Sequence, residues 1–214
     1  GAGLKQADAD EENLFVISPD YFSEKAINLS DYMGEWAVSD DVWTDPSNYR
    51  TPFYNGTGFM VMARHKDVAD KVVEAGFSYG IVPIPKYDEA QKEYYSACGF
   101  PYTMWMITSV CKDGERAAYV MEALASESYR TVQPEVYENL KYRGNSDPLN
   151  GKMFDLIIES KTYDMGRIFH NMFEWSNSPV AAFRSRMYKY DNDNWYSALA
   201  STSEAMQSVI DNIN

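Results

Sequence analysis

The stretch Tyr79-Gly80-Ile81-Val82-Pro83-Ile84-Pro85 combines an apolar run with two prolines. A short apolar run bounded by turn residues predicts a β-strand. Proline has no backbone N–H for a ladder, so Pro83 and Pro85 favour the exit or the edge of a sheet. Just upstream, 67–75 carries apolar residues at helical spacing, and Gly76 follows where a helix commonly ends. A predicted helix therefore leads directly into a predicted strand.

The rest of the chain adds further elements of both kinds. Apolar and β-branched runs predict strands at 14–17, 58–62 and 102–110. Helical spacing, with first-turn prolines and with caps at Ser18 and Asp113, predicts helices at 19–35, 115–125, 131–142, 147–157 and 201–213. The apolar spacing comes from Phe22, Ala26, Leu29 and Met33 in the first of these helices, from Leu149, Met153, Leu156 and Ile157, which are expected to point inward, in the fourth, and from Met206, Val209, Ile210 and Ile213, which line the last. The last helix is expected to begin at the capping box Ser201-Thr202-Ser203-Glu204. Few strands early, many helices late and no internal repeat predict a helix-rich α/β or α+β body.

Composition excludes some classes of partner. The 214 residues carry 19 Lys and Arg against 32 Asp and Glu, a net charge of −13. Nucleic-acid binding needs clustered cations, and no basic run is present, so we expect no nucleic-acid partner. The sequence has no apolar stretch of about eighteen residues, the length that a membrane span requires. The 17 Tyr and 5 Trp suit either a wet binding surface or a core.

Two cysteines, Cys98 and Cys111, are too few for a disulfide scaffold. They leave two alternatives, a single bridge between them or two buried thiols.

One enzyme pattern occurs. Gly76-Phe77-Ser78-Tyr79-Gly80 matches G-x-S-x-G, the nucleophile elbow of hydrolases. In that elbow a strand enters and a helix leaves, whereas here the predicted order is reversed. The glycines are better explained as a helix end and a strand start, so we expect Ser78 not to be catalytic. Asp8 to Glu12 resembles the opening of a calcium loop but lacks its glycine and closing glutamate. The sequence therefore predicts no enzyme activity, no metal and no cofactor.

Three stretches carry a family resemblance. Tyr79 to Gln91, followed by Glu93-Tyr94-Tyr95-Ser96, is similar to a strand that ends in G-x-x-P-x-P. Phe53 to Met62 looks like F-x-x-G-x-x-x with an apolar strand, and Glu115 to Tyr129 looks like a helix that ends in E-A-L-A-S-E-S-Y. These stretches resemble family 1 extracellular solute-binding proteins, which have the maltose-binding-protein-like, type II periplasmic binding fold. The resemblance covers most of the chain, with a departure at Asp8–Asn13, where members often carry D-A-D-G.

The resemblance implies a partial periplasmic-binding-protein-like II fold, α/β and helix-rich, with parts of both lobes. It implies lobe two for 1–77, a hinge-crossing strand at 78–85, lobe one for 86–125 and lobe-two helices for 126–214. A complete member has a further amino-terminal half, so the chain is expected to be a carboxy-terminal part. Ser78–Pro83 and Ala125–Thr131 are the expected hinges.

The resemblance also implies five ligand contacts. Arg64 and His65 follow the 58–62 strand, where members place ligand-facing groups, although a solvated strand end is an equal alternative. Phe100 and Tyr102 lie where a cleft-side loop of lobe one is expected. Trp175 lies in the segment before a long helix, where aromatic residues often stack on a sugar.

By resemblance, the chain is the ligand-binding component of an ABC importer that closes two lobes around a carbohydrate. The expected partners are a sugar or oligosaccharide and an ABC permease. The expected location is the cell surface, through a lipid anchor on the missing amino-terminal part, or the periplasm. Exposed sheet edges of a partial lobe also favour a dimer of the fragment. The alternatives are a peptide or polyamine ligand, a serine hydrolase that uses Ser78, and an interaction domain that has lost the cleft.

Overall fold

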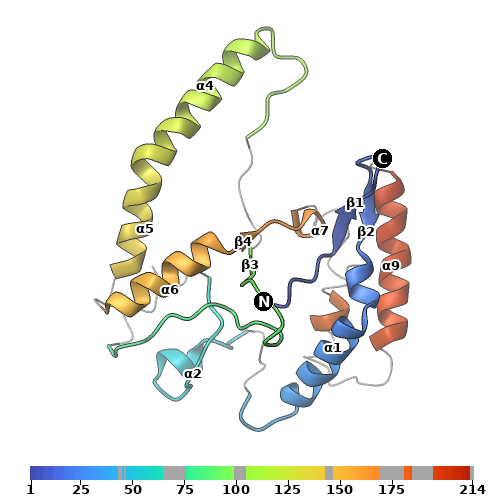
Figure 1. Ribbon diagram of the computed structural model, residues 1–214, viewed down its shortest axis with the longest axis vertical. Coiled ribbons are helices and arrows are strands. Elements are labelled where there is room, and N and C mark those ends of the chain that lie inside the picture. Colours follow the sequence, from blue (N-terminus) through green and yellow to red (C-terminus); the bar gives the residue numbers. More distant parts are fainter. Residues whose placement is uncertain are drawn as a thin grey trace. The chain divides into compact units, whose positions relative to one another are not determined.

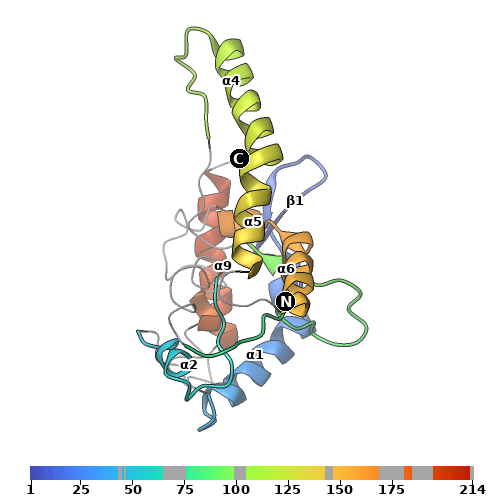
Figure 2. The ribbon, with the colours of Figure 1, turned by 90° about the vertical axis from the view of Figure 1, so that its left-hand side faces the viewer.

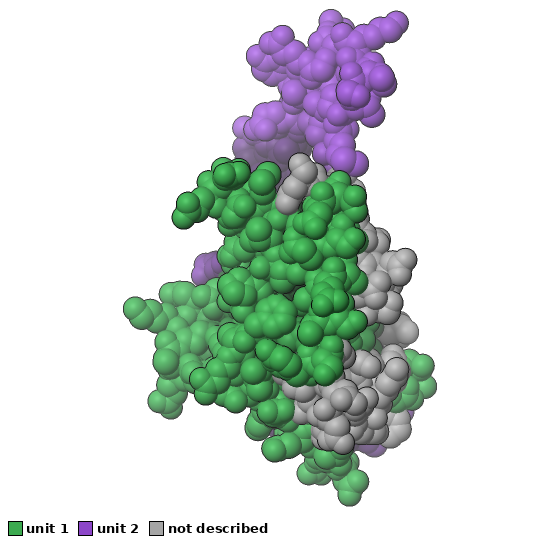
Figure 3. Space-filling model, turned by 90° about the vertical axis from the view of Figure 1, so that its right-hand side faces the viewer, with its two compact units in different colours: residues 1–52, 84–100, 160–214 green, residues 53–83, 101–159 purple. Residues whose placement is uncertain are grey.

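A computed structural model (Figure 1) describes residues 1–42, 45, 47–64, 76–98, 105–142, 147–168, 181–184 and 195–212. This part is mixed α/β and mainly helical, as the sequence predicts. The chain forms two compact units, each built from separate stretches (Figure 3). Unit 1 comprises Gly1–Pro52, Ile84–Phe100 and Ser160–Asn214, and unit 2 comprises Phe53–Pro83 and Pro101–Glu159.

Unit 1 begins with a β-hairpin. Strand β1 (Ala7–Ala9) pairs antiparallel with β2 (Phe15–Ile17), so the predicted strand at 14–17 is confirmed. In the connecting turn the Asp10 carboxylate accepts the backbone N–H groups of Glu12 and Leu14, both at 2.9 Å. Asn13 adopts a left-handed φ of 62°, which asparagine tolerates better than most residues. Asp10 therefore stabilises the turn itself.

The helix predicted at 19–35 forms as two helices. A 3₁₀ helix, η1 (Pro19–Phe22), is capped by Ser18, and α1 (Glu24–Ala37) is capped by Ser23, whose hydroxyl accepts the Ala26 N–H at 3.2 Å. The buried face of α1 consists of small residues, namely Ala26, Ser30, Gly34 and Ala37. The chain buries Tyr21 and exposes Phe22, the reverse of what the apolar spacing indicates.

The last helix, α9 (Trp195–Asp211), packs against β2 (Figure 1). Met206 and Ile210 are fully buried with Ala7, as predicted for the inward face of this helix. The predicted start at Ser201–Glu204 is wrong, because α9 is already helical there. The hydroxyls of Thr202 and Ser203 donate to the Leu199 carbonyl at 2.9 and 2.8 Å, the bonding that these residues make inside a helix.

Asp164 ties the amino-terminal stretch to the short helix α7 (Met165–Ile168). Its carboxylate accepts the N–H groups of Gln6 at 2.9 Å, Ala7 at 3.3 Å and Gly166 at 3.0 Å. Gly166 lies so close to the same stretch that a Cβ there would be 2.5 Å from the Cβ of Gln6. Nearby, β3 (Ser96–Ala97) and β4 (Lys161–Thr162) form a parallel pair that the sequence did not predict.

Unit 2 contains a long helical rod. Helix α4 (Gly114–Glu127) continues through the π-helical turn η3 (Ser128–Val132) into α5 (Gln133–Tyr142), as Figures 1 and 2 show. Asp113 caps α4 by accepting the Arg116 N–H at 2.9 Å, as predicted. The expected break between 125 and 131 is absent, because the chain stays helical through η3, where the Thr131 hydroxyl donates to the Glu127 carbonyl.

Helix α6 (Pro148–Glu159) packs against α5. The Lys141 ammonium bridges Glu138 at 2.8 Å and Asp155 at 2.5 Å, and these carboxylates raise the pKa of Lys141. Phe154 is buried beside Tyr137. The buried face of α6 is Asn150, Gly151 and Phe154, so the expectation that Leu149 points inward is wrong.

Three predicted strands are not observed. Residues 58–62, 79–84 and 105–110 make no ladder, and the described part contains only the two-stranded sheets β1–β2 and β3–β4. Phe59 is 90% exposed. A strand needs a neighbour for its backbone groups, and no described segment supplies one here. Residues 102–104 of the third prediction lie outside the described residues.

Both cysteines are free thiols, so the bridge is not formed. Cys98 is half-buried and Cys111 is exposed, so the alternative of two buried thiols is also wrong.

Helix α2 (Thr51–Tyr54) spans the point where the chain first passes into unit 2.

We expect Gly166→Ala to lower the free energy of unfolding by about 1–3 kcal/mol, because the new methyl group overlaps the Cβ of Gln6. Gly114→Ala is the matched control, since nothing lies within 4 Å of a Cβ there. Alanine in the first turn of α4 should raise stability by up to about 1 kcal/mol. Thermal unfolding followed by circular dichroism measures both. Equal effects of the two substitutions would contradict the close approach at Gly166.

Asp164→Ala removes the acceptor of three backbone N–H groups and should cost about 2–3 kcal/mol. Asp8→Ala is the control, because Asp8 makes an exposed ion pair with Lys5, worth less than about 1 kcal/mol, and accepts one exposed N–H, that of the adjacent Ala9 at 3.1 Å. Amide exchange at Gln6 and Ala7, read by mass spectrometry, should accelerate in the first variant alone. Unchanged exchange in Asp164→Ala would show that the carboxylate does not hold this stretch.

Candidate functional site

The predicted ligand contacts are only partly described. Arg64 has an exposed side chain at the end of the irregular stretch 58–64 in unit 2. The other four, His65, Phe100, Tyr102 and Trp175, lie outside the described residues. The set of five therefore remains a prediction.

The stretch Tyr79–Pro85 lies at a passage between the two units. The chain leaves unit 2 at Pro83 and enters unit 1 at Ile84. The second expected hinge, Ala125–Thr131, is helical and lies within unit 2. The first expected hinge, Ser78–Pro83, ends at this passage, whereas the second includes no passage between the units.

Asn150 holds the unit 2 side of this passage. Its side chain is only 3% exposed. Its Nδ2 donates to the Tyr79 carbonyl at 3.2 Å, and its Oδ1 accepts the Ile81 N–H at 2.8 Å. A carboxamide offers the same donor and acceptor as a peptide group, so Asn150 takes the place of a neighbouring strand.

The residues around Asn150 fix its position on α6, although the sequence analysis did not identify it. Asp147 accepts the Leu149 N–H at 2.9 Å and the Asn150 N–H bonds to the Asp147 carbonyl at 3.0 Å, which fixes the first turn of α6. Asn150 is one helical turn before the buried Phe154 and so faces the same way. A polar residue on an apolar helix face was the signal that could have found it.

On the unit 1 side, the loop after the passage is ordered by its own side chains. The Gln91 carboxamide accepts the Tyr87 N–H at 3.1 Å and donates to the carbonyls of Gly1 at 2.9 Å and Glu93 at 2.7 Å. The Lys86 ammonium donates to the Lys92 carbonyl at 2.6 Å and lies 4.6 Å from the centre of the Tyr94 ring. The passage is thus anchored on both sides.

The electrostatics of the described residues do not indicate catalysis. Burial raises the pKa of Tyr79, and burial followed by the Asp164 charge raises the pKa of Tyr21, which disfavours ionisation of both phenols. Ser78 is exposed, and both histidines, His65 and His170, lie outside the described residues. Among the described residues, no group of three His, Cys, Asp or Glu side chains could hold a metal ion.

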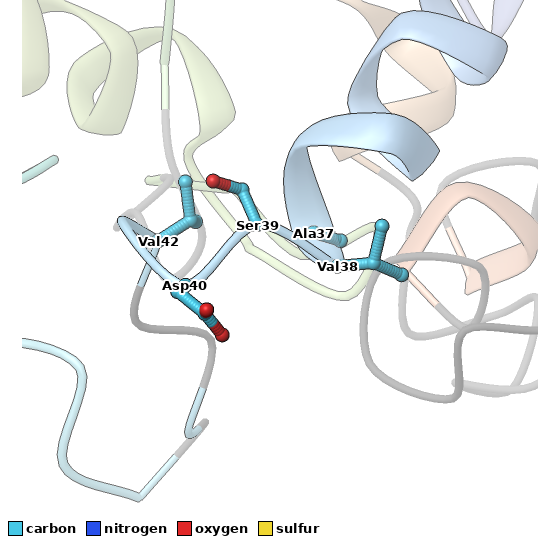
Figure 4. Close-up of a pocket in the computed structure, with 5 residues that line it drawn as sticks. All are labelled: Ala37, Val38, Ser39, Asp40 and Val42. Carbon is cyan, nitrogen blue, oxygen red and sulfur yellow. The ribbon is translucent and has the colours of Figure 1, made fainter.

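Two surface hollows that described residues line do not have the form of a ligand site. One, of about 400 Å³, lies at the end of α1 and is lined by Ala37, Val38, Ser39, Asp40 and Val42 (Figure 4). In Figure 4 the Ser39 hydroxyl and the Asp40 carboxylate point in opposite directions. The other, of about 390 Å³, is lined among the described residues by Glu135, Val136, Asn139 and Leu140 of α5. A ligand site needs polar groups that converge from several elements.

An aromatic pair on α1 also escaped the sequence reasoning. Tyr32 and Trp36 stack with ring centres 6.0 Å apart and planes at 28°. Both rings are more than half exposed, at 59% and 52%. Their spacing of four residues places them on one face of the helix, and that spacing was the available signal.

No family model, no curated protein and no solved structure matches the chain. Within the described residues, no helix has the length and apolar character that a membrane span requires. The function must therefore be argued from the residues and from the two units.

Proposed function

We propose that the chain is a carboxy-terminal part of the solute-binding component of an ABC importer, and that it binds a carbohydrate by closure of two lobes. The observation that carries this proposal is the passage at Pro83–Ile84. There the stretch Y-G-I-V-P-I-P leaves one compact unit and enters another. Closure by a hinge requires two separately packed bodies joined by a few chain passages, and this arrangement supplies both.

The discontinuity of the units supports the same function. Each unit is assembled from stretches that are separated in sequence by the other, so several passages join the two bodies. Several connections restrict the relative motion of two bodies more than a single flexible linker does. A ligand that contacts both bodies then favours one bent state over the other.

Charge and composition support a neutral solute. The net charge of −13 disfavours anionic ligands, and the 17 Tyr and 5 Trp supply flat rings with polar tips that suit sugars. The described part offers no catalytic arrangement around Ser78. The proposal includes an ABC permease as the macromolecular partner and a location at the cell surface, through a lipid anchor, or in the periplasm.

We expect a mono- or oligosaccharide to stabilise the protein. A ligand at 100 times its Kd stabilises by about 2.7 kcal/mol, which corresponds to a rise in Tm of roughly 5–10 °C at this chain length. A thermal-shift screen of sugars, with polyamines and short peptides as comparison sets, measures this. A shift with amines or peptides and none with sugars would reject the carbohydrate, and no shift in any set would reject solute binding.

Trp175→Ala should weaken the binding of the best sugar by about tenfold, because loss of a stacked indole costs roughly 1–2 kcal/mol. Trp36→Ala is the matched control, since Trp36 is an exposed indole on α1 that the resemblance does not place at the ligand. Isothermal titration measures the Kd of the sugar for both variants, and only Trp175→Ala should raise it. Loss of binding only in Trp36→Ala would move the sugar to the aromatic pair on α1.

A further inference from the structure

The passage between the units is stiff at its centre. Pro83 and Pro85 have a fixed φ, and each restricts the residue before it, Val82 or Ile84, to extended or polyproline-like conformations. Four consecutive residues therefore have little backbone freedom. We call Val82–Pro85 the strut, because it is stiff. A bend must therefore occur elsewhere in the stretch.

Gly80 is the residue of the stretch that can bend. It has no side chain and reaches conformations closed to its neighbours. It does not need them in this structure, because its φ is not in the left-handed region. A Cβ at Gly80 would meet the Asn150 Oδ1 at 3.9 Å, an ordinary contact. Alanine therefore fits here without strain, and glycine adds only freedom.

Asn150 removes that freedom. Its two hydrogen bonds go to Tyr79 and Ile81, the residues on either side of Gly80. Both bonds must lengthen or break when the backbone at Gly80 rotates. The carboxamide is almost fully buried, so a broken bond leaves a buried polar group without its partner, which is unfavourable.

Helix α6 connects this contact to a second passage. Asn150 is in its first turn, and its last residue, Glu159, is where the chain leaves unit 2 for Ser160 of unit 1. In unit 1, Ser160 and Ser96 join through N–H···O and hydroxyl bonds, both at 2.8 Å. The second passage therefore lies between the end of α6 in unit 2 and the start of β4, which pairs with β3, in unit 1.

We propose that Gly80 is the pivot of the hinge and that the Asn150 carboxamide is a latch that holds it in one conformation. Opening of the latch lets the strut turn, and closing restores the two bonds. The role of this motion in ligand capture rests on the proposed function, whereas the latch itself does not.

The first test is amide exchange at Ile81 in the ligand-free protein. Asn150→Leu removes both bonds at similar volume, and we expect exchange at Ile81 to accelerate by at least about tenfold. Asn150→Asp keeps the acceptor for Ile81 and loses the donor to Tyr79, so its exchange should be intermediate. Lys152→Ala, an exposed position on the same helix, is the control and should leave the rate unchanged. Equal rates in Asn150→Leu and Lys152→Ala would overturn the latch.

The second test reads the motion between the units. The two cysteines lie one in each unit, Cys98 in unit 1 and Cys111 in unit 2, so spin labels report the distance between the units without added substitutions. Asn150→Leu should broaden the distance distribution, and Gly80→Ala in that background should narrow it again. Broadening that persists in the double variant would overturn Gly80 as the pivot.

Gly80→Ala alone tests the pivot even if the Asn150 variants fail to fold. It should narrow the distribution relative to the unsubstituted protein, and an unchanged or broader one would overturn the proposal. No ligand is present in either test, so failure here leaves sugar binding open. A failed sugar screen likewise leaves the latch open.

Discussion

The pair of hydrogen bonds from Asn150 to Tyr79 and Ile81 is the constraint on which the passage between the units depends. Pro83 and Pro85 have no N–H to donate to a ladder, yet the half-buried residues Tyr79 and Ile81 still need partners for their backbone groups. A helix supplies them here through one carboxamide, and the cap at Asp147 fixes where that carboxamide lies. The cap at Asp147 therefore positions α6, α6 positions the Asn150 carboxamide, and the carboxamide positions the passage. Each step is local, so the passage can be positioned without a sheet.

The two units differ in how they are stabilised. Unit 1 has buried apolar clusters, a hairpin packed on α9, and a carboxylate that binds three N–H groups. In unit 2, neither α4 nor α5 has a buried residue, and the apolar stretches 58–62 and 105–110 have no ladder. Segments with few buried contacts are the first to open. Near Asn150, α5 and α6 are joined by the Lys141–Asp155 ion pair and by the contact of Tyr137 with the buried Phe154.

Local signals predicted the structure better than signals that need a partner. The caps at Ser18 and Asp113 depend on neighbouring residues alone, and both are observed. The strand at 58–62 depends on a neighbouring strand, which composition cannot reveal. Apolar spacing identified α6 but placed its buried face one residue early, because tertiary packing selects Asn150 and Phe154 over Leu149. The predicted ligand set came from resemblance, and only Arg64 falls in the described part, so the candidate site was predicted least.

In the proposed mechanism, the free energy of ligand binding must offset the cost of opening the Asn150 hydrogen bonds. Two buried hydrogen bonds cost about 1–3 kcal/mol each to open, so the latched state is favoured by at most a few kcal/mol. A ligand with micromolar affinity contributes about 8 kcal/mol, which exceeds this cost. Reversal of a 1:99 population needs a difference of about 5.5 kcal/mol between the two states. A sugar that contacts both units can supply that difference, whereas one that contacts a single unit binds without moving the hinge. In the proposed mechanism, closure therefore requires a ligand that contacts both bodies.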